Sequence, residues 1–202
     1  MKKIFYMLLV GVVMVSTAMQ VQAQMDKPNN SVRIGWSYMP LAPTDPQQYG
    51  LSNRVIYGNG SHAATVEYTH RIGELFSVGA YAGVGGYTYI KYPDETPSIS
   101  NPYDYAKDAV MVRFGVSGQV QLLPLMGVET TCLDVYAAGR LGSVRLYYNW
   151  IEYGAGVGAT LNITRNIGLY GSCMWGRYWA ALEDANVYRA NLNTQLGLQF
   201  SF

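Results

Sequence analysis

A serine and a histidine, the residue types of a catalytic nucleophile and its general base, are adjacent in the first half of the sequence. The pair is Ser61 and His62, and Asp45 precedes it in the same stretch. A hydroxyl beside an imidazole is the minimum for covalent catalysis. Adjacent residues of a β-strand point to opposite faces, so the pair fails as a site if this stretch is a strand. We predict no catalytic residue.

Other familiar chemistry is missing from the sequence. The two histidines and two cysteines lack the close spacing of a metal site, and no Gly-Lys-Ser/Thr phosphate loop occurs. Cys132 and Cys173 fall on segments that we expect to be non-neighbouring and oppositely facing, so we predict no disulfide. The formal charge of +1 gives no basic surface for nucleic acid. We expect no cofactor, no metal and no nucleic-acid partner.

Charged residues are scarce, and several of them fall inside apolar segments. They make up 13% of the chain, whereas hydrophobic residues make up 50%; an average soluble domain has about 25% charged residues. Four positive and three negative residues share the polar side of the segments described below: Arg33, Glu67, Arg113, Asp134, Arg140, Glu152 and Arg189. Buried charges are tolerated when they are paired and hydrogen-bonded. We predict an interior charge network.

The segments that position these charges alternate between apolar and polar residues, clearly in some segments and more weakly at 31–39, 62–72, 76–92 and 167–179. From Tyr188 to Phe202 one set of alternate residues is almost entirely apolar and the other is polar or small. A period of two indicates a β-strand. Eight such segments occur, at 31–39, 62–72, 76–92, 109–122, 130–145, 151–163, 167–179 and 188–202.

The connections between the segments alternate in length. Short turns are predicted at Gly73-Glu74, 124–127 and 164–166; the opposite side has connections at 40–61, 93–108, 146–150 and 180–187. An even number of antiparallel strands with turns on one side and loops on the other is typical of a transmembrane β-barrel. We therefore predict an all-β fold, an eight-stranded antiparallel up-and-down transmembrane β-barrel.

Alternation alone leaves open a soluble lipocalin-like barrel, in which the apolar face would surround a ligand. Two observations favour an apolar face turned to lipid. The polar face is mostly Gly, Ser, Thr, Asn and Gln, a poor solvent surface. Aromatic residues also gather like interfacial girdles. At the loop ends they are Trp36, Tyr38, Tyr147, Tyr148, Trp150, Tyr153, Trp175, Tyr178 and Trp179, and at the turn ends Phe76, Phe200 and Phe202.

The N-terminus has the features of a secretory signal peptide. Lys2 and Lys3 precede an apolar run at 4–15, and a small-residue cleavage site ends at Ala23. The run is short for a spanning helix, which needs about 20 residues. We predict a signal peptide at 1–23 and a barrel domain at 24–202.

With these features the chain resembles the small outer-membrane proteins of Gram-negative bacteria, the OmpA-like and OmpX-like eight-stranded families. The resemblance rests on the signal peptide, the eight segments across 31–202 and the ending from Leu196 to Phe202. It implies a monomer in the cell outer membrane, surrounded by lipid and lipopolysaccharide. It also implies that Phe200 and Phe202 form the signal that the barrel assembly machinery reads.

The rim suggests what such a barrel does. Arg145 and Arg177 have the lipid-facing parity at loop ends, where guanidinium groups can bind lipopolysaccharide phosphates or simply extend into solvent. Loops 40–61 and 93–108 contain Pro and Tyr, a composition suited to an extracellular protein or host-surface ligand. We predict a structural or adhesion-type role. The alternative is a lipid A-modifying enzyme, as some small barrels are, but an acyl-chain pocket needs an apolar interior and the predicted interior is polar.

Overall fold

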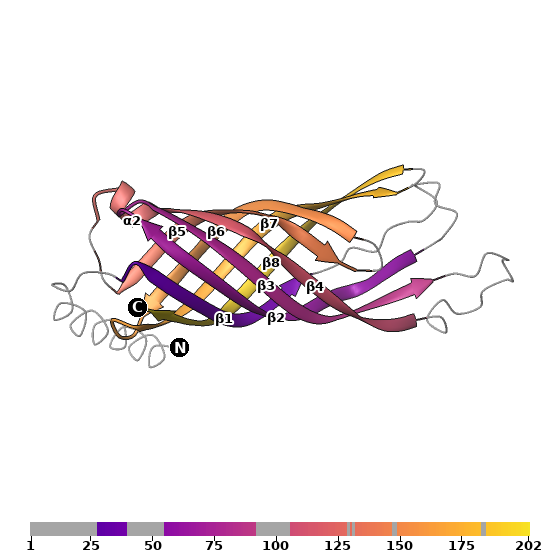
Figure 1. Ribbon diagram of the computed structural model, residues 1–202, viewed down its shortest axis with the longest axis horizontal. Helices are drawn as coiled ribbons and strands as arrows, with labels where there is room; N and C mark the ends of the chain where they lie inside the picture. Colours follow the sequence, from indigo (N-terminus) through magenta and orange to yellow (C-terminus); the bar gives the residue numbers. More distant parts are fainter. Residues whose placement is uncertain are drawn as a thin grey trace, which may run out of the picture.

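The chain forms a closed barrel of eight strands, each paired with the next along the sequence (Figure 1). The computed structural model describes residues 28–39, 55–91, 106–128, 130, 132–146, 149–182 and 185–202. The predicted eight-stranded antiparallel architecture is confirmed. The predicted signal peptide lies outside the described residues.

The strands are long enough to cross a bilayer obliquely. They contain between 10 and 18 residues, and a tilted strand needs about 9–11. Their bounds are β1 Asn30–Met39, β2 Val55–Ile72, β3 Phe76–Lys91, β4 Ala106–Gln121, β5 Leu133–Arg145, β6 Asn149–Asn162, β7 Ile167–Leu182 and β8 Ala185–Ser201.

The first and last strands close the barrel. Val32 of β1 lies opposite Phe200 of β8, and Ile34 lies opposite Leu198. The backbones of Asn30 and Phe202 exchange hydrogen bonds of 3.1 and 2.9 Å. Each strand therefore has a neighbour on both sides in the part of the barrel where all eight strands overlap, and its backbone groups are paired there within the sheet.

Tight turns join the strands at the end of the barrel that also holds the C-terminus (Figure 1). Gly73 and Gly127 have φ of 66° and 72°, a left-handed conformation that favours glycine. A short helix, α2 (Leu122–Leu125), occupies the turn around Pro124 and was not expected from the sequence. Within the described ranges, no helix has the length and apolar character needed to traverse a membrane.

The strands extend further at the loop end than the sequence indicates. β2 begins at Val55 and β4 at Ala106, so parts of the predicted loops 40–61 and 93–108 are strand. The register between β2 and β3 shifts between Tyr57 and Ser61, which breaks the regular alternation on which the prediction depends. The predicted connection at 180–187 is likewise mostly strand, because β7 reaches Leu182 and β8 starts at Ala185.

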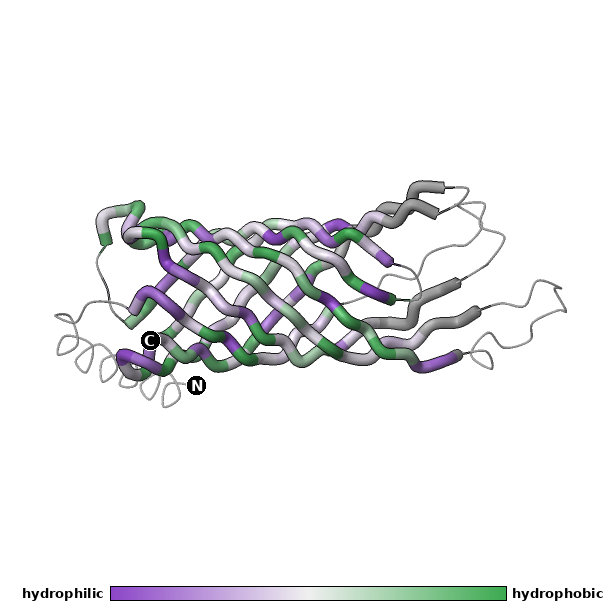
Figure 2. Tube along the Cα trace, viewed as in Figure 1, coloured by the Kyte–Doolittle hydropathy of each residue, from purple (hydrophilic) through white to green (hydrophobic). Residues whose placement is uncertain are grey.

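The apolar face of the strands is the outer one. Val110 and Leu196 are 68% and 70% exposed on the outside, whereas Arg113 and Glu67 are 0% and 3% exposed on the inside. Hydrophobic and hydrophilic residues alternate along the strands in Figure 2. The outward apolar face is confirmed, and the lipocalin-like arrangement is wrong because charged side chains occupy the interior.

Two residues assigned to the outer aromatic girdle lie inside the barrel. Trp150 and Tyr178 are only 2% and 3% exposed. Their neighbours Ile151 and Arg177 take the outer face, so the alternation of the strand turns both aromatic rings inward. Other members of the predicted girdles are exposed: Trp36, Tyr38, Tyr153, Trp175, Phe76, Phe200 and Phe202. Tyr147 and Tyr148 lie outside the described residues.

Glycines make room for tyrosine rings in the interior. A Cβ atom on Gly158 would come within 2.7 Å of Cε2 of the Tyr136 ring. A Cβ on Gly115 would similarly approach the Tyr81 hydroxyl at 2.7 Å. Eight strands leave space only for side chains, so a bulky ring on one strand needs a residue without a side chain on the next. This pairing accounts for part of the high content of both residue types.

We expect Gly158→Ala to lower the free energy of unfolding by about 1–3 kcal/mol, the usual cost of overpacking. The buried Tyr136 ring has no free space into which to move. Urea unfolding of the folded barrel in detergent micelles measures the effect. Gly86→Ala is the matched control, since its Cβ would meet its nearest heavy atom only at 3.9 Å. Equal stabilities of the two variants would contradict the packing argument.

Candidate functional site

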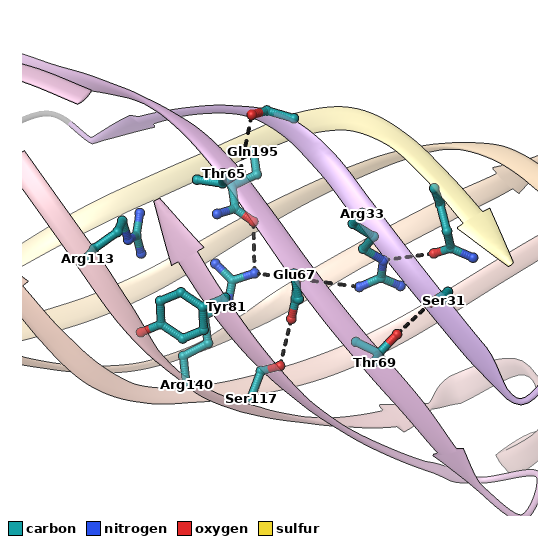
Figure 3. A network of polar contacts seen from close by, with 12 residues as sticks. Ser31, Arg33, Thr65, Glu67, Thr69, Tyr81, Arg113, Ser117, Arg140 and Gln195 are labelled. Atoms are coloured by element: carbon teal, nitrogen blue, oxygen red, sulfur yellow. Dashed lines mark hydrogen bonds and ion pairs between the residues drawn. The ribbon is translucent and has the colours of Figure 1, made fainter. Parts of the chain in front are cut away.

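Glu67 is the centre of a buried ionic cluster in the half of the barrel nearer the turns (Figure 3). One carboxylate oxygen lies 2.9 Å from Nη2 of Arg140 and 3.9 Å from Nη1 of Arg33. The other oxygen accepts a 2.6 Å hydrogen bond from the Ser117 hydroxyl. The carboxylate, placed on β2, thus meets side chains from β1, β4 and β5.

Two glutamines on β8 complete this cluster. Arg140 donates to Oε1 of Gln195 at 2.8 Å, and Nε of Arg33 donates to Oε1 of Gln199 at 2.8 Å. The Arg33 guanidinium also lies 4.6 Å from the centre of the Tyr136 ring, a cation–π distance. These contacts pair buried charges that would otherwise be costly, while Nε and Nη1 of Arg140 keep no hydrogen-bond partner among the described residues.

A second ion pair, between Arg113 and Glu152, lies nearer the loop end. The hydroxyls of Tyr81 and Tyr178 donate to the Glu152 carboxylate at 3.2 and 3.3 Å. The Tyr81 ring also lies 5.0 Å from the Arg140 guanidinium and 5.5 Å from that of Arg113. Tyr81 therefore touches members of both ionic groups.

Asp134 belongs to a third ion pair, near the turn end. It pairs with Arg71 at 3.7 Å and accepts a 2.9 Å hydrogen bond from the Asn162 amide. Arg71 was not among the predicted interior charges, although it has the same inward parity on its strand as Glu67. The side chain of Arg189, the seventh predicted charge, lies outside the described part of the structure.

The interior near the loops contains more apolar side chains than the expectation of a polar interior allowed, although Ser37 and Ser61 are also buried there. Several buried apolar residues lie in the loop-side parts of their strands or just beyond them: Met39, Ala63, Tyr87, Met111, Val144, Leu146 and Trp150. Val144 and Trp150 are direct cross-strand neighbours. The Glu67 cluster lies toward the turns, the Arg113–Glu152 pair lies nearer the loops, and apolar side chains such as Val144 and Trp150 lie beyond this pair.

The structure does not bring Ser61 and His62 together. Ser61 is buried inside and its hydroxyl donates to the Met39 carbonyl at 3.5 Å. His62 lies on the outside, where Nδ1 accepts a 3.1 Å hydrogen bond from the Trp36 indole. Asp45 lies outside the described residues. In the part of the chain that the structure describes, no three residues among His, Cys, Asp and Glu are grouped as metal ligands.

Arg145 and Arg177 are both exposed on the outer face but lie apart. Arg177 is opposite Tyr153, which is opposite Leu141, and Arg145 is four residues further along β5. This offset is about 13 Å along the strand and about 10 Å across two strand spacings. The two guanidinium groups therefore belong to different parts of the rim. Arg177 lies 5.8 Å from the centre of the Trp175 ring.

Solved structures include barrels of the same architecture. The outer membrane protein OprG from Pseudomonas aeruginosa is similar with a TM-score of 0.60 and 7% sequence identity, over 87% of this chain and 96% of its own. This chain has the fold of the small outer-membrane β-barrels. No protein-family model and no curated protein sequence matches the chain.

Two further outer-membrane-type barrels have lower scores. Outer membrane protein W of E. coli has a TM-score of 0.49 at 11% identity, over 89% of this chain and 100% of its own. Ail, the attachment invasion locus protein of Yersinia pestis, has a TM-score of 0.46 at 11% identity, over 88% and 100%.

We expect Glu67→Gln to destabilise this outer-membrane-type barrel by about 3–5 kcal/mol, because it leaves two buried guanidinium groups without their counter-charge. Urea unfolding of the folded barrel measures the loss. The same substitution at exposed Glu74, in the turn after β2, is the control and should change stability by less than about 0.5 kcal/mol. A Glu67→Gln variant as stable as the control would show that the cluster does not stabilise the barrel.

Proposed function

We propose that the protein is an integral outer-membrane barrel with a structural, non-catalytic role, and that its loops make contacts outside the cell. One observation carries this proposal: the burial is inverted relative to a water-soluble protein. Large apolar side chains cover the outside, while arginines and glutamates occupy the inside. Exposure of so large an apolar surface costs free energy in water but not in the hydrocarbon of a lipid bilayer.

The filled interior supports a structural role over that of a diffusion pore. Tyr81, Tyr136 and Arg113 are almost fully buried within the barrel. Eight-stranded barrels generally have only enough internal space for side chains. By this proposal the protein is a rigid barrel in the membrane that carries the loops on the cell surface. The interior charge network stabilises the barrel.

The loops are the proposed contact surface for an extracellular protein or a host-surface ligand. Tyr103 and Tyr105 stand among Asp94, Glu95 and Asp104, a mixture of aromatic and acidic residues suited to protein contacts. These residues lie outside the described part of the structure, so sequence composition alone supports this part of the proposal.

The rim and the closing strand suggest two envelope partners. We propose that Arg145 and Arg177 bind separate lipopolysaccharide phosphates, since both are exposed near the loop ends. Phe200 and Phe202 are exposed at the turn end, where the assembly machinery is proposed to read them during closure of the barrel.

The membrane assignment is testable at one outward position. We expect Leu196→Lys to lower the stability of the barrel in lipid vesicles by about 2–4 kcal/mol, because the cation would face hydrocarbon. Leu196→Ala is the control for lost side-chain volume. The readout is urea unfolding, followed by the gel shift that a folded barrel shows before and after boiling. A soluble monomer without a shift, or a lysine variant no less stable than the alanine variant, would overturn the proposal.

The loop role has its own test. We expect deletion of residues 94–104 to leave the gel shift unchanged and to reduce adhesion of expressing cells to host surfaces. The loop contributes to the contact surface and, by this proposal, little to the barrel. Full adhesion by the deletion variant contradicts the adhesive part of the proposal. Release of fatty acid from lipid A by the purified barrel would instead support the enzymatic alternative.

A further inference from the structure

A groove of about 1000 Å³ crosses the outer surface from β2 to β7. Consecutive cross-strand neighbours form one ladder along it: His70, Val78, Gly118, Gly139, Ala155 and Trp175. A parallel ladder runs from Tyr68 to Arg177 and forms the adjoining side. These residues are distant in the sequence, and only the register of the strands brings them into one line.

The small residues in the middle of the groove are not required by the packing of the barrel. A Cβ atom on Gly118 would meet no heavy atom within 4 Å, and one on Gly139 would meet only a backbone oxygen at 3.9 Å. Gly158, in contrast, is needed under the Tyr136 ring. Glycine within a strand weakens the strand and presents no side chain to lipid. The open space above Gly118 and Gly139 therefore has no explanation within the barrel itself.

The groove starts near the turn end and rises through about half of the hydrocarbon thickness toward the loop end. Its five interstrand steps span about 24 Å. His70 is two residues from the turn end of β2, whereas Trp175 is eight residues from the turn end of β7. With strands tilted by about 35–45°, the ladder climbs by about 15 Å, half of the roughly 30 Å hydrocarbon thickness.

The two ends of the groove differ in chemistry. At the loop end Arg177 lies beside the Trp175 ring, 5.8 Å from its centre. At the turn end His70 is engaged with Oδ1 of Asn30 at 2.8 Å. A guanidinium group above an apolar channel complements an amphiphile that carries a phosphate at the head of an acyl chain.

We propose that one acyl chain of lipid A lies in this groove, with a lipid A phosphate bound by Arg177. The inference rests on the proposed location in the outer membrane, where the loop ends, and therefore Arg177, face the leaflet that contains lipopolysaccharide. It adds to the rim contact an acyl-chain site, with Gly118, Gly139 and Ala155 along its floor and Val116 and Leu141 on one side.

Filling the groove tests the proposal without disturbing the barrel. The double variant Gly118→Leu, Gly139→Leu occupies the open space, and Gly86→Leu is the matched control at an exposed glycine outside the groove. Each protein is first checked for the boiling-dependent gel shift, then mixed with hexa-acylated lipid A or with phosphatidylglycerol and examined by native mass spectrometry. We expect the wild type and Gly86→Leu to retain one lipid A. The filled variant should retain it at least tenfold less, and Arg177→Gln should also reduce retention.

Three results would overturn the inference. They are equal lipid A retention by the filled variant and the wild type, equal retention of phosphatidylglycerol and lipid A, and a wild-type dimer that the filled variant loses. The last result would assign the groove to a second copy of the chain. A wild type without the gel shift overturns the proposed membrane function instead, so the two failures are distinguishable.

Discussion

Backbone hydrogen bonding is the constraint on which the rest of this structure depends. A strand in hydrocarbon has no water to satisfy its N–H and C=O groups, so each strand needs a partner on both sides. The pairing of β1 with β8 meets that requirement and turns a row of strands into a cylinder. Once the cylinder is closed, successive side chains along a strand point alternately outward to lipid and inward to the lumen.

The narrow lumen then determines which residues the interior can hold. Tyrosine rings fit where a neighbouring strand has glycine, as Tyr136 does over Gly158. Charges fit where their partners come from other strands, and Glu67 meets arginines from β1 and β5. Tyr81 contacts both ionic groups, so packing and electrostatics are joined at one ring. From the turn end to the loop end, the interior contains the Glu67 cluster, then the Arg113–Glu152 pair, then a region with many apolar side chains.

Alternation made the fold and most facings predictable from the sequence. Parity placed Arg33, Glu67 and Arg113 on the polar face, the composition of that face and the aromatic positions turned it inward, and all three residues lie inside. Trp150 and Tyr178 were misplaced because position near a strand end was given more weight than parity. The start of β2 was missed because a register shift interrupts its alternation. The pairs within the charge network, and the line from His70 to Trp175, depend on strand register, which local sequence patterns do not encode.

The closing pair of strands also determines when folding can finish. β1 and β8 are the first and last strands, and Arg33 reaches Gln199 across a separation of 166 residues. Until β8 arrives, β1 and the latest strand added each present a row of unpaired backbone groups, the kind of edge that invites aggregation. The barrel therefore has no stable half-built form in hydrocarbon. The open edges of the incomplete sheet must be protected from other chains and from lipid until β8 pairs with β1. That pairing then closes the barrel in one step.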